Sequence, residues 1–417
     1  MLRPYRALFA RPGALAFSAA GVIARMPMSM VGIAIVLVVS TGYGSYGLAG
    51  RVAAAMVITV AVTGPWIARM VDRHGQARVM RPALVTSCVG LVVLSVASAV
   101  HAHQAWLYAG AVLAGCGGNI GALVRTRWSH ALVDEPRLIH TAFSLESALD
   151  ELVFVVGPVL ATVLATSAMP LLGFLVPCAA VLIGGAWFLA QRRTEPPLSA
   201  HAASHRGDSL LRRRGVVPLL VAFIGMGVIF GATDVSTVAF ATEEGHRAAA
   251  GAVLAVFAAG SMTSGFLYGA RHWRVSQARR FATAIVLLAA GVCLFLIVGS
   301  LGALAGTMFV VGFAISPSII AGNGLMADLV PVGRLTEGLS WIGAAITLGN
   351  AAGAAVAGSR IDAAGSHGGY LFIVGVGVAT VLLVTAAYPA LRRAGSHTVD
   401  AAAADEAIPE PAPAQET

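Results

Sequence analysis

The chain has 417 residues, of which 58% are hydrophobic and 11% are charged, with a mean hydropathy of +0.83. A soluble domain carries roughly a quarter charged residues and cannot hide this much apolar surface from water, so a soluble globular fold is excluded. The formal net charge of +8 would suit a nucleic-acid partner. The arginines, however, are scattered in short segments between apolar runs, so we expect no nucleic acid to bind. The composition predicts a protein whose solvent is the lipid bilayer.

Apolar runs recur along the whole chain, and each is long enough to form a membrane-crossing helix. Such a helix needs about 20 apolar residues to cross roughly 30 Å of hydrocarbon. We expect the spans at residues 13–40, 47–68, 82–100, 105–124, 141–166, 170–190, 216–240, 249–270, 281–299, 303–327, 339–358 and 369–391. The predicted fold class is therefore an all-α membrane protein with twelve transmembrane helices.

The longest polar break in the chain divides these spans into six and six. It covers residues 191–215 and contains a run of arginines. We predict an N-terminal six-helix bundle at residues 1–190, a cytoplasmic linker at 191–215 and a C-terminal six-helix bundle at 216–395. Residues 396–417 are rich in Ala, Pro and Glu and lack apolar periodicity, which predicts a disordered cytoplasmic tail.

Most arginines lie in the segments between spans that share one side of the membrane with the N-terminus. Arg51, Arg247 and Arg360 fall near the opposite ends of the spans, and Arg25 falls within the first span. Short loops rich in arginine remain in the cytoplasm. We therefore expect both termini inside the cell, in the plasma membrane, which would be the inner membrane of a bacterium. We expect the chain to act as a monomer.

Short sequence matches relate the first six spans to the last six. Gln76-Ala77-Arg78 follows the second span, and Gln277-Ala278-Arg279 follows the eighth. Arg137-Leu138 and Arg334-Leu335 each precede a span with a central glycine. Matches at equivalent places predict two pseudo-symmetric halves. In such proteins the substrate site lies between the halves, near the middle of the membrane.

A short charged motif follows the second span. Residues 68–78, ARMVDRHGQAR, resemble the signature G-x-L-a-D-R-x-G-r-[RK] of the major facilitator superfamily. Asp72, Arg73 and Gly75 match this signature, whereas Ala68 stands where glycine is usual. The equivalent stretch of the second half, residues 265–280, has no Asp. The resemblance implies the fold of that family, two six-helix bundles, and the activity of a secondary transporter.

The resemblance also implies that this motif latches the cytoplasmic side of the transporter in one state. Gly75 permits a sharp turn between two antiparallel spans. Asp72 lies at a helix end, where it can pair with an arginine or face the N-terminus of another helix. The alternative is a basic loop that only sets topology. We favour the latch, formed by Asp72, Arg73 and Gly75.

The fifth span contains Gly157-Pro158, which resembles the core of an antiporter motif in the same family, although the flanking glycines are absent. Proline removes a helical hydrogen bond and kinks a helix. The pair is therefore either part of an antiport signature or a kink that aids packing. In span four, Ala111 stands where drug antiporters of the family usually carry an arginine, so their coupling scheme does not transfer directly.

Ionisable side chains within the spans are functional candidates, because their desolvation must be offset. Arg25 lies roughly 18 Å along the first span, near the membrane centre, and needs a carboxylate, a watery cavity or an anionic substrate. Glu146 and Asp150 share one face of the fifth span, and Glu151 lies about 100° away. We predict Asp150 or Glu146 as the proton site, with Arg25 as its partner and Glu151 nearby. If the span begins later, Glu146 is an interfacial residue instead.

Further polar and aromatic side chains are weaker candidates for a substrate cavity. Asparagines between helices often only hydrogen-bond across them, and an aspartate near the outer end of a span can be interfacial. The candidates are Asn119, Asp234, Asn323, Trp341 and Asn350.

The sequence carries no signature of an enzyme or of a bound cofactor. We find no phosphate-binding loop and no zinc-type His-Glu-x-x-His motif. The cysteines lie in apolar runs without metal or disulfide spacing, namely Cys88, Cys116, Cys178 and Cys293. We therefore expect no enzyme activity, no cofactor and no metal.

The predicted function is proton-coupled efflux of a small hydrophobic or amphipathic compound, in exchange for protons. One alternative is a proton-linked transporter of an anionic metabolite that binds Arg25. Another, from a different class, is a membrane sensor or scaffold that transports nothing.

Overall fold

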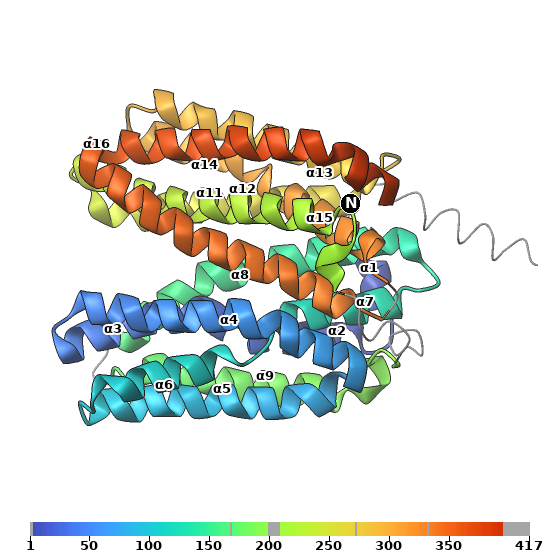
Figure 1. The fold of residues 1–417 in the computed structure, drawn as a ribbon, viewed down its shortest axis with the longest axis horizontal. Coiled ribbons are helices and arrows are strands. Elements are labelled where there is room, and N and C mark those ends of the chain that lie inside the picture. Colours follow the sequence, from blue (N-terminus) through green and yellow to red (C-terminus); the bar gives the residue numbers. More distant parts are fainter. Residues whose placement is uncertain (1–2, 167–168, 199–208, 272, 332, 395–417) are drawn as a thin grey trace, which may run out of the picture.

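The computed structural model is helical throughout the residues that it describes, which are 3–166, 169–198, 209–271, 273–331 and 333–394 (Figure 1). The predicted tail at 396–417 and the middle of the predicted linker lie outside these residues. The α-helices are α1 Arg3–Phe9, α2 Ala14–Arg25, α3 Pro27–Tyr43, α4 Tyr46–His74, α5 Gln76–Ala99, α6 Gln104–Gly115, α7 Ile120–Ala131, α8 Ile139–Ala165, α9 Leu172–Ala190, α11 Val216–Glu243, α12 Ala250–Ala270, α13 Gln277–Cys293, α14 Leu301–Gly312, α15 Ile315–Leu329 and α16 Leu335–Ala394. Short 3-10 helices are η1 Pro136–Leu138, η2 Arg192–Thr194, η3 Leu210–Arg212, η4 Arg247–Ala249 and η5 Leu294–Ile297.

In the described part of the chain, 11 helical segments are long and apolar enough to cross a membrane. The last of them, α16, is two helices in one. Ala364 and Gly365 have non-helical backbone angles, and Gly365 has a φ of 68°, which favours glycine. Glu243 caps the second of these helices, because its Oε1 accepts the N–H of Ser366 at 2.7 Å. Counted as two helices, α16 brings the spans to the predicted twelve, and the fold class is confirmed.

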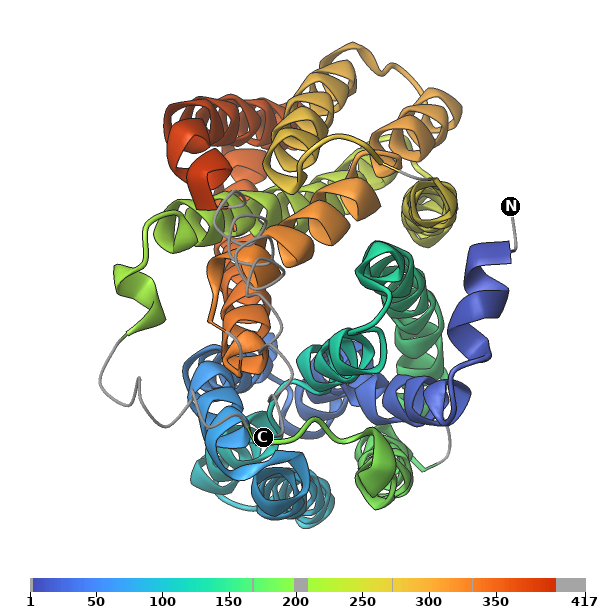
Figure 2. The same cartoon turned by 90° about the vertical axis from the view of Figure 1, so that its right-hand side faces the viewer.

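The helices form two groups, each with its own buried apolar core. One core joins residues of α1 to α9, and the other joins residues of η3 to α16 together with Ala122 of α7. Viewed along the helices, the first group (blue to green) lies below the second (green to red), as Figure 2 shows. Between the groups, α8 packs on α12 and α15, and α4 packs on α16.

The sequence repeat corresponds to equivalent places in the two groups. Gln76 is the first residue of α5 and Gln277 the first of α13. A Cβ on Gly157 of α8 would lie 1.9 Å from Oγ of Ser29 on α3, and a Cβ on Gly353 of α16 would lie 2.2 Å from the carbonyl oxygen of Val228 on α11. Both glycines therefore permit close helix packing. Helix α8 continues through Pro158 without a break.

The sequence suggested that the charged motif after the second span forms a loop, but most of the motif is helical. Helix α4 extends to His74, so Asp72 and Arg73 belong to its last turn. Gly75 alone connects α4 to α5, with a φ of 90° that a residue with a Cβ adopts poorly. The longer helix places Asp72 against the second group of helices.

Hydrogen bonds between the two groups gather at the end of the bundle that holds α1, the last turn of α4 and the first turn of α16. We call this the inner end, and its cross-group bonds the inner gate. The bonds of the inner gate are Tyr5 Oη to the carbonyl of Phe266 at 2.8 Å, Thr141 Oγ1 to the carbonyl of Gly269 at 2.8 Å, His140 Nε2 with the carbonyl of Arg271 at 3.0 Å, Thr126 Oγ1 with Thr336 Oγ1 at 3.1 Å, and the N–H of Glu337 to Oδ2 of Asp72 at 2.9 Å. The two groups are thus joined at the inner end.

Candidate functional site

Three of the spans are interrupted near their middle. The breaks are at Met26 between α2 and α3, at residues 116–119 between α6 and α7, and at residues 313–314 between α14 and α15. At the second break Gly118 has a φ of 72°, and Asn119 caps α7 by accepting the N–H of Ala122 at 3.0 Å. Broken helices expose backbone polar groups at membrane depth, where transporters build their sites.

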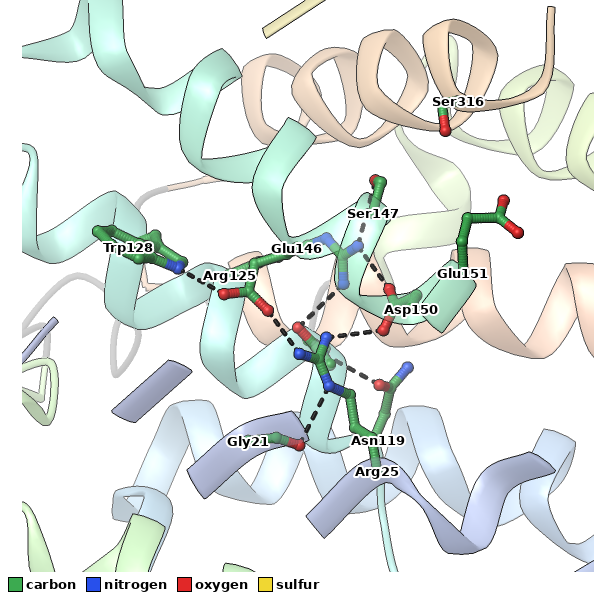
Figure 3. Close-up of polar contacts among 12 residues, drawn as sticks. Gly21, Arg25, Asn119, Arg125, Trp128, Glu146, Ser147, Asp150, Glu151 and Ser316 are labelled. Carbon is green, nitrogen blue, oxygen red and sulfur yellow. Dashed lines mark hydrogen bonds and ion pairs between the residues drawn. The ribbon is translucent and has the colours of Figure 1, made fainter. Parts of the chain in front are cut away.

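Arg25 is the last residue of α2, beside the first of these breaks. Its Nη2 lies 2.6 Å from Oε2 of Glu146 and its Nη1 lies 2.7 Å from Oδ1 of Asp150, both on α8. Its Nε donates to the carbonyl of Gly21 at 3.1 Å (Figure 3). Only 3% of Arg25 is exposed, so protein acceptors, not solvent, bind the guanidinium.

A second arginine, which the sequence analysis missed, completes this network. Nη2 of Arg125 lies 2.8 Å from Oδ2 of Asp150, so Asp150 bridges two arginines (Figure 3). The fourth span predicted from the sequence ends at residue 124, which would leave Arg125 in the following segment, but α7 continues to Ala131 and buries it. Arg127 is likewise buried, over the ring of Phe188 at 3.8 Å. Neither arginine is evidence for the orientation of the chain.

Glu146 is fully buried and has hydrogen-bond donors on both carboxylate oxygens. Its Oε1 accepts from Ser18 Oγ at 2.7 Å and from Trp128 Nε1 at 2.8 Å, while Oε2 faces Arg25. Trp128 in turn packs edge-on against Phe17, with ring centroids 4.8 Å apart. The interfacial alternative for Glu146 is therefore wrong. We call Arg25, Arg125, Glu146 and Asp150 the charge network, and its formal charges sum to zero.

Glu151 does not belong to this network, because its side chain points to the second group of helices (Figure 3). Its Oε1 accepts a hydrogen bond from Oγ of Ser261 on α12 at 2.6 Å. The hydroxyls of Ser261 and Ser316 are 3.0 Å apart, and Ser316 lies in the first turn of α15. The three acids of α8 thus occupy two different environments.

At the inner end, Asp72 contacts the N-terminus of a helix in the other group. Its Oδ2 accepts the N–H of Glu337, in the first turn of α16, at 2.9 Å. A carboxylate at this place interacts favourably with the helix dipole. Glu337 itself pairs with Arg334 at 2.7 Å. Asp72 therefore joins α4 to α16 across the two groups.

The turn at Gly75 is bound by the start of the segment that follows α9. Oε1 of Glu195 accepts the N–H of Ala77 at 3.0 Å, and Oε2 pairs with Arg192 at 2.7 Å. Burial raises the pKa of the Glu195 carboxyl, but the bonds from Arg192 and Ala77 and the charges of Arg192 and Arg127 outweigh it and hold this pKa below its ordinary value.

The five cavity candidates are dispersed over several helices. Asn119 lies beside the charge network (Figure 3), and a Cβ on Gly343 would come within 2.7 Å of its Nδ2. Asn323 is buried, Trp341 and Asn350 are half-buried, and Asp234 is exposed.

Two signals in the sequence could have revealed what was missed. Gly117-Gly118-Asn119 is a helix stop followed by an N-cap residue, which predicts that a new helix begins at Ile120. A helix from there would carry Arg125 and Trp128 on successive turns toward the fifth span. No local signal identifies Ser18 as a donor to Glu146.

A buried charge network in a bundle of twelve spans is typical of a multi-pass membrane transporter. The chain belongs to the Major Facilitator Superfamily, because the model of that family matches residues 17–279. The resemblance seen in the charged motif is thereby confirmed.

Solved structures share this fold at low sequence identity. The crystal structure of the human organic anion transporter MFSD10 (TETRAN) is 15% identical, with a TM-score of 0.66 over 90% of this chain and 99% of that one. The crystal structure of a bacterial homologue of the iron transporter ferroportin, in its outward-facing state, is 15% identical, with a TM-score of 0.67 over 91% of this chain and 99% of that one. No curated protein matches the sequence.

Proposed function

We propose that this transporter couples the entry of protons to the export of a small hydrophobic or amphipathic compound across a bacterial plasma membrane. The observation that carries the proposal is the set of carboxyl groups on α8 at membrane depth: Glu146 and Asp150, which bind Arg25, and Glu151, which faces α12. Arginine keeps its proton at any working pH, so the carboxyl groups are the members of this site that can exchange protons. Ionisable groups at this depth are rare unless they serve transport.

The charge balance of the site supports a substrate without negative charge. Two arginines and two carboxylates cancel, and Arg25 is 3% exposed with both of its Nη atoms bound. An anionic substrate would have to displace Glu146 or Asp150 from Arg25. In that alternative, Arg25→Ala abolishes transport of an anion and spares neutral lipophiles.

The arrangement of the two groups supports alternating access with both termini in the cytoplasm. In this proposal residues 1–190 and 216–395 move as two bundles, and the inner gate closes the cytoplasmic side. Asp72 at the N-terminus of α16 supports the closed state as a latch, with Arg73 and Gly75 in the same turn. The similar ferroportin homologue was captured facing outward, which agrees with closure at the inner end.

The test is transport by the purified full-length chain in proteoliposomes with an imposed pH gradient. We expect ethidium, a lipophilic cation, and a neutral lipophilic dye to move against their gradients, and a protonophore to stop this movement. Asp150→Asn removes the carboxylate that bridges Arg25 and Arg125 and is expected to lower the coupled rate at least tenfold. Glu244→Gln, at an exposed acid beyond α11, is the matched control.

Two results would contradict the proposal. Dye movement that does not depend on the pH gradient would rule out proton coupling. Absence of both net transport and counterflow for every lipophilic and anionic probe would favour a membrane sensor or scaffold.

A further inference from the structure

Glu151 connects the two groups of helices at the middle of the membrane. It lies midway along α8, and its bond to Ser261 reaches α12 midway along that helix. Ser261 and Ser316 are both fully buried, and the hydroxyl of Ser316 contacts that of Ser261, which in turn donates to Glu151. This contact lies farther from the inner end than the bonds of the inner gate.

In the part of the chain that the structure describes, no ion pair joins Glu151 to a cation. Helices α3, α9 and α12, which pack on α8, carry no charged side chain, and the charged residue of α15 is Asp328, at its inner end. Helix α1 and η1 bring their arginines to the inner end. Helices α2 and α7 supply Arg25, Arg125, Arg127 and His130. Helix α8 itself carries His140 near its inner end and Glu146, which is held by Arg25. The titratable groups of α3, α9 and α12 are Tyr43, Cys178 and Tyr268.

Those arginines already have partners, and the described ion pairs do not include Glu151. Arg25 and Arg125 are held by Glu146 and Asp150, and Arg127 donates to Gln76, Gln191 and Thr194. The charged neighbour of Glu151 on its own helix, Asp150, is negative. A second negative charge beside it would be opposed both by repulsion and by loss of water.

We propose that Glu151 is the group that carries the transported proton, and that the charge network stays ionised and positions the helices. This inference rests on the proposed proton coupling and assigns it to one residue. In the network each negative charge has an arginine, so proton uptake there would break an ion pair. At Glu151 proton uptake removes a charge that has a serine hydroxyl as its partner, and the neutral acid fits between the two groups of helices.

The position of Glu151 connects its proton to the movement of the halves. Glu151 is partly exposed in the state in which the inner gate is closed. In our proposal the proton therefore reaches it from the outer side. The neutral acid lets the contact with Ser261 persist while the two groups move. Once the inner gate has opened, water from the cytoplasmic side reaches the carboxyl and accepts the proton.

Infrared spectroscopy of the purified protein in lipid tests the assignment without knowledge of the substrate. We expect a protonated-carboxyl C=O band that appears and disappears with pH. The band is lost in Glu151→Gln and kept in Asp150→Asn and in the exposed control Glu244→Gln. Ser261→Ala leaves the acid in place and moves the band to higher frequency, since the carboxyl loses one hydrogen bond. This variant keeps the test open if Glu151→Gln fails to fold.

Transport of ethidium gives a second, independent readout. Glu151→Gln is expected to lose at least tenfold in movement driven by the pH gradient while it retains ethidium counterflow without a gradient. Persistence of the band in Glu151→Gln, its loss in Asp150→Asn, an unmoved band in Ser261→Ala, or normal gradient-driven transport by Glu151→Gln would each overturn the assignment. Absence of gradient-driven transport in the unmodified protein would instead refute the proposed function, so the two failures are distinct.

Discussion

Removal of one charge from the charge network is expected to destabilise the fold far more than the small change in side-chain volume alone would. Glu146→Gln keeps the shape of the side chain, and its amide oxygen can still accept from Ser18 and Trp128. It leaves Arg25 and Arg125 to share Asp150 alone, so the formal charge of the buried network changes from zero to +1. Breaking a buried ion pair on one side costs about 3–5 kcal/mol.

Arg25→Gln gives the opposite imbalance, a formal charge of −1, and a loss of similar size. In the double variant the charges of Arg125 and Asp150 cancel again. We therefore expect the two losses to be non-additive, with a coupling free energy of about 1–3 kcal/mol in favour of the double variant. The free energies of unfolding are measured by titrating SDS into mixed micelles and following tryptophan fluorescence. Losses that add to within about 0.5 kcal/mol would refute the charge-balance reasoning.

Three further predictions concern the packing and the inner end. Gly231→Leu places a Cβ 2.0 Å from the carbonyl oxygen of Asn350 and is expected to lower the free energy of unfolding by about 3 kcal/mol or more, and with it the yield of monodisperse protein. The control Gly251→Leu, where no atom lies within 4 Å of the added Cβ, is expected to leave that yield unchanged. Equal yields of the two variants would contradict the close packing of α11 on α16. Asp72→Asn weakens the helix-dipole contact by about 0.3–1 kcal/mol. Distances between spin labels at the inner ends of α5 and α13 are then expected to show an open population that is roughly two- to fivefold larger. An unaltered distance distribution would argue against a latch. Glu195→Gln is expected to lower thermal stability at pH 7, because a carboxyl pKa that is lowered in the folded state stabilises the fold at pH values above its ordinary pKa of 4.5. The difference in stability from the unmodified protein is expected to disappear as the pH falls below 4.5. A difference that persists in acid would have another cause.

The fold could be predicted from the sequence because each membrane helix must satisfy the same constraint on its own. Each span must be long and apolar, whatever its neighbours are, so the twelve spans could be found one by one. The ends of the spans could not be predicted in this way, because polar residues at a helix end can be buried by another part of the chain. Helix α4 continues past the apolar run to His74, since Asp72 finds a partner on α16, more than 250 residues later in the sequence.

The site was predictable where the spacing along one helix decides which residues lie together. Glu146 and Asp150, four residues apart, do face Arg25. Glu151 was predicted as part of the same group, yet it faces α12, because one residue turns a helix by about 100°. Arg125 was missed for a different reason: its burial depends on the break before α7, and an arginine just beyond an apolar run is more often a loop residue.

Two hydroxyls of the first group donate to backbone carbonyls of the second at the inner gate. Tyr5 donates to the carbonyl of Phe266, and Thr141 donates to that of Gly269. Every amino acid offers a backbone carbonyl, so a substitution at position 266 keeps the acceptor, whereas Tyr5→Phe deletes the donor. Positions 266 and 269 are therefore constrained differently: the acceptor at 266 does not depend on the side chain, whereas a Cβ on Gly269 would lie 2.5 Å from Oη of Tyr5 and displace the donor itself.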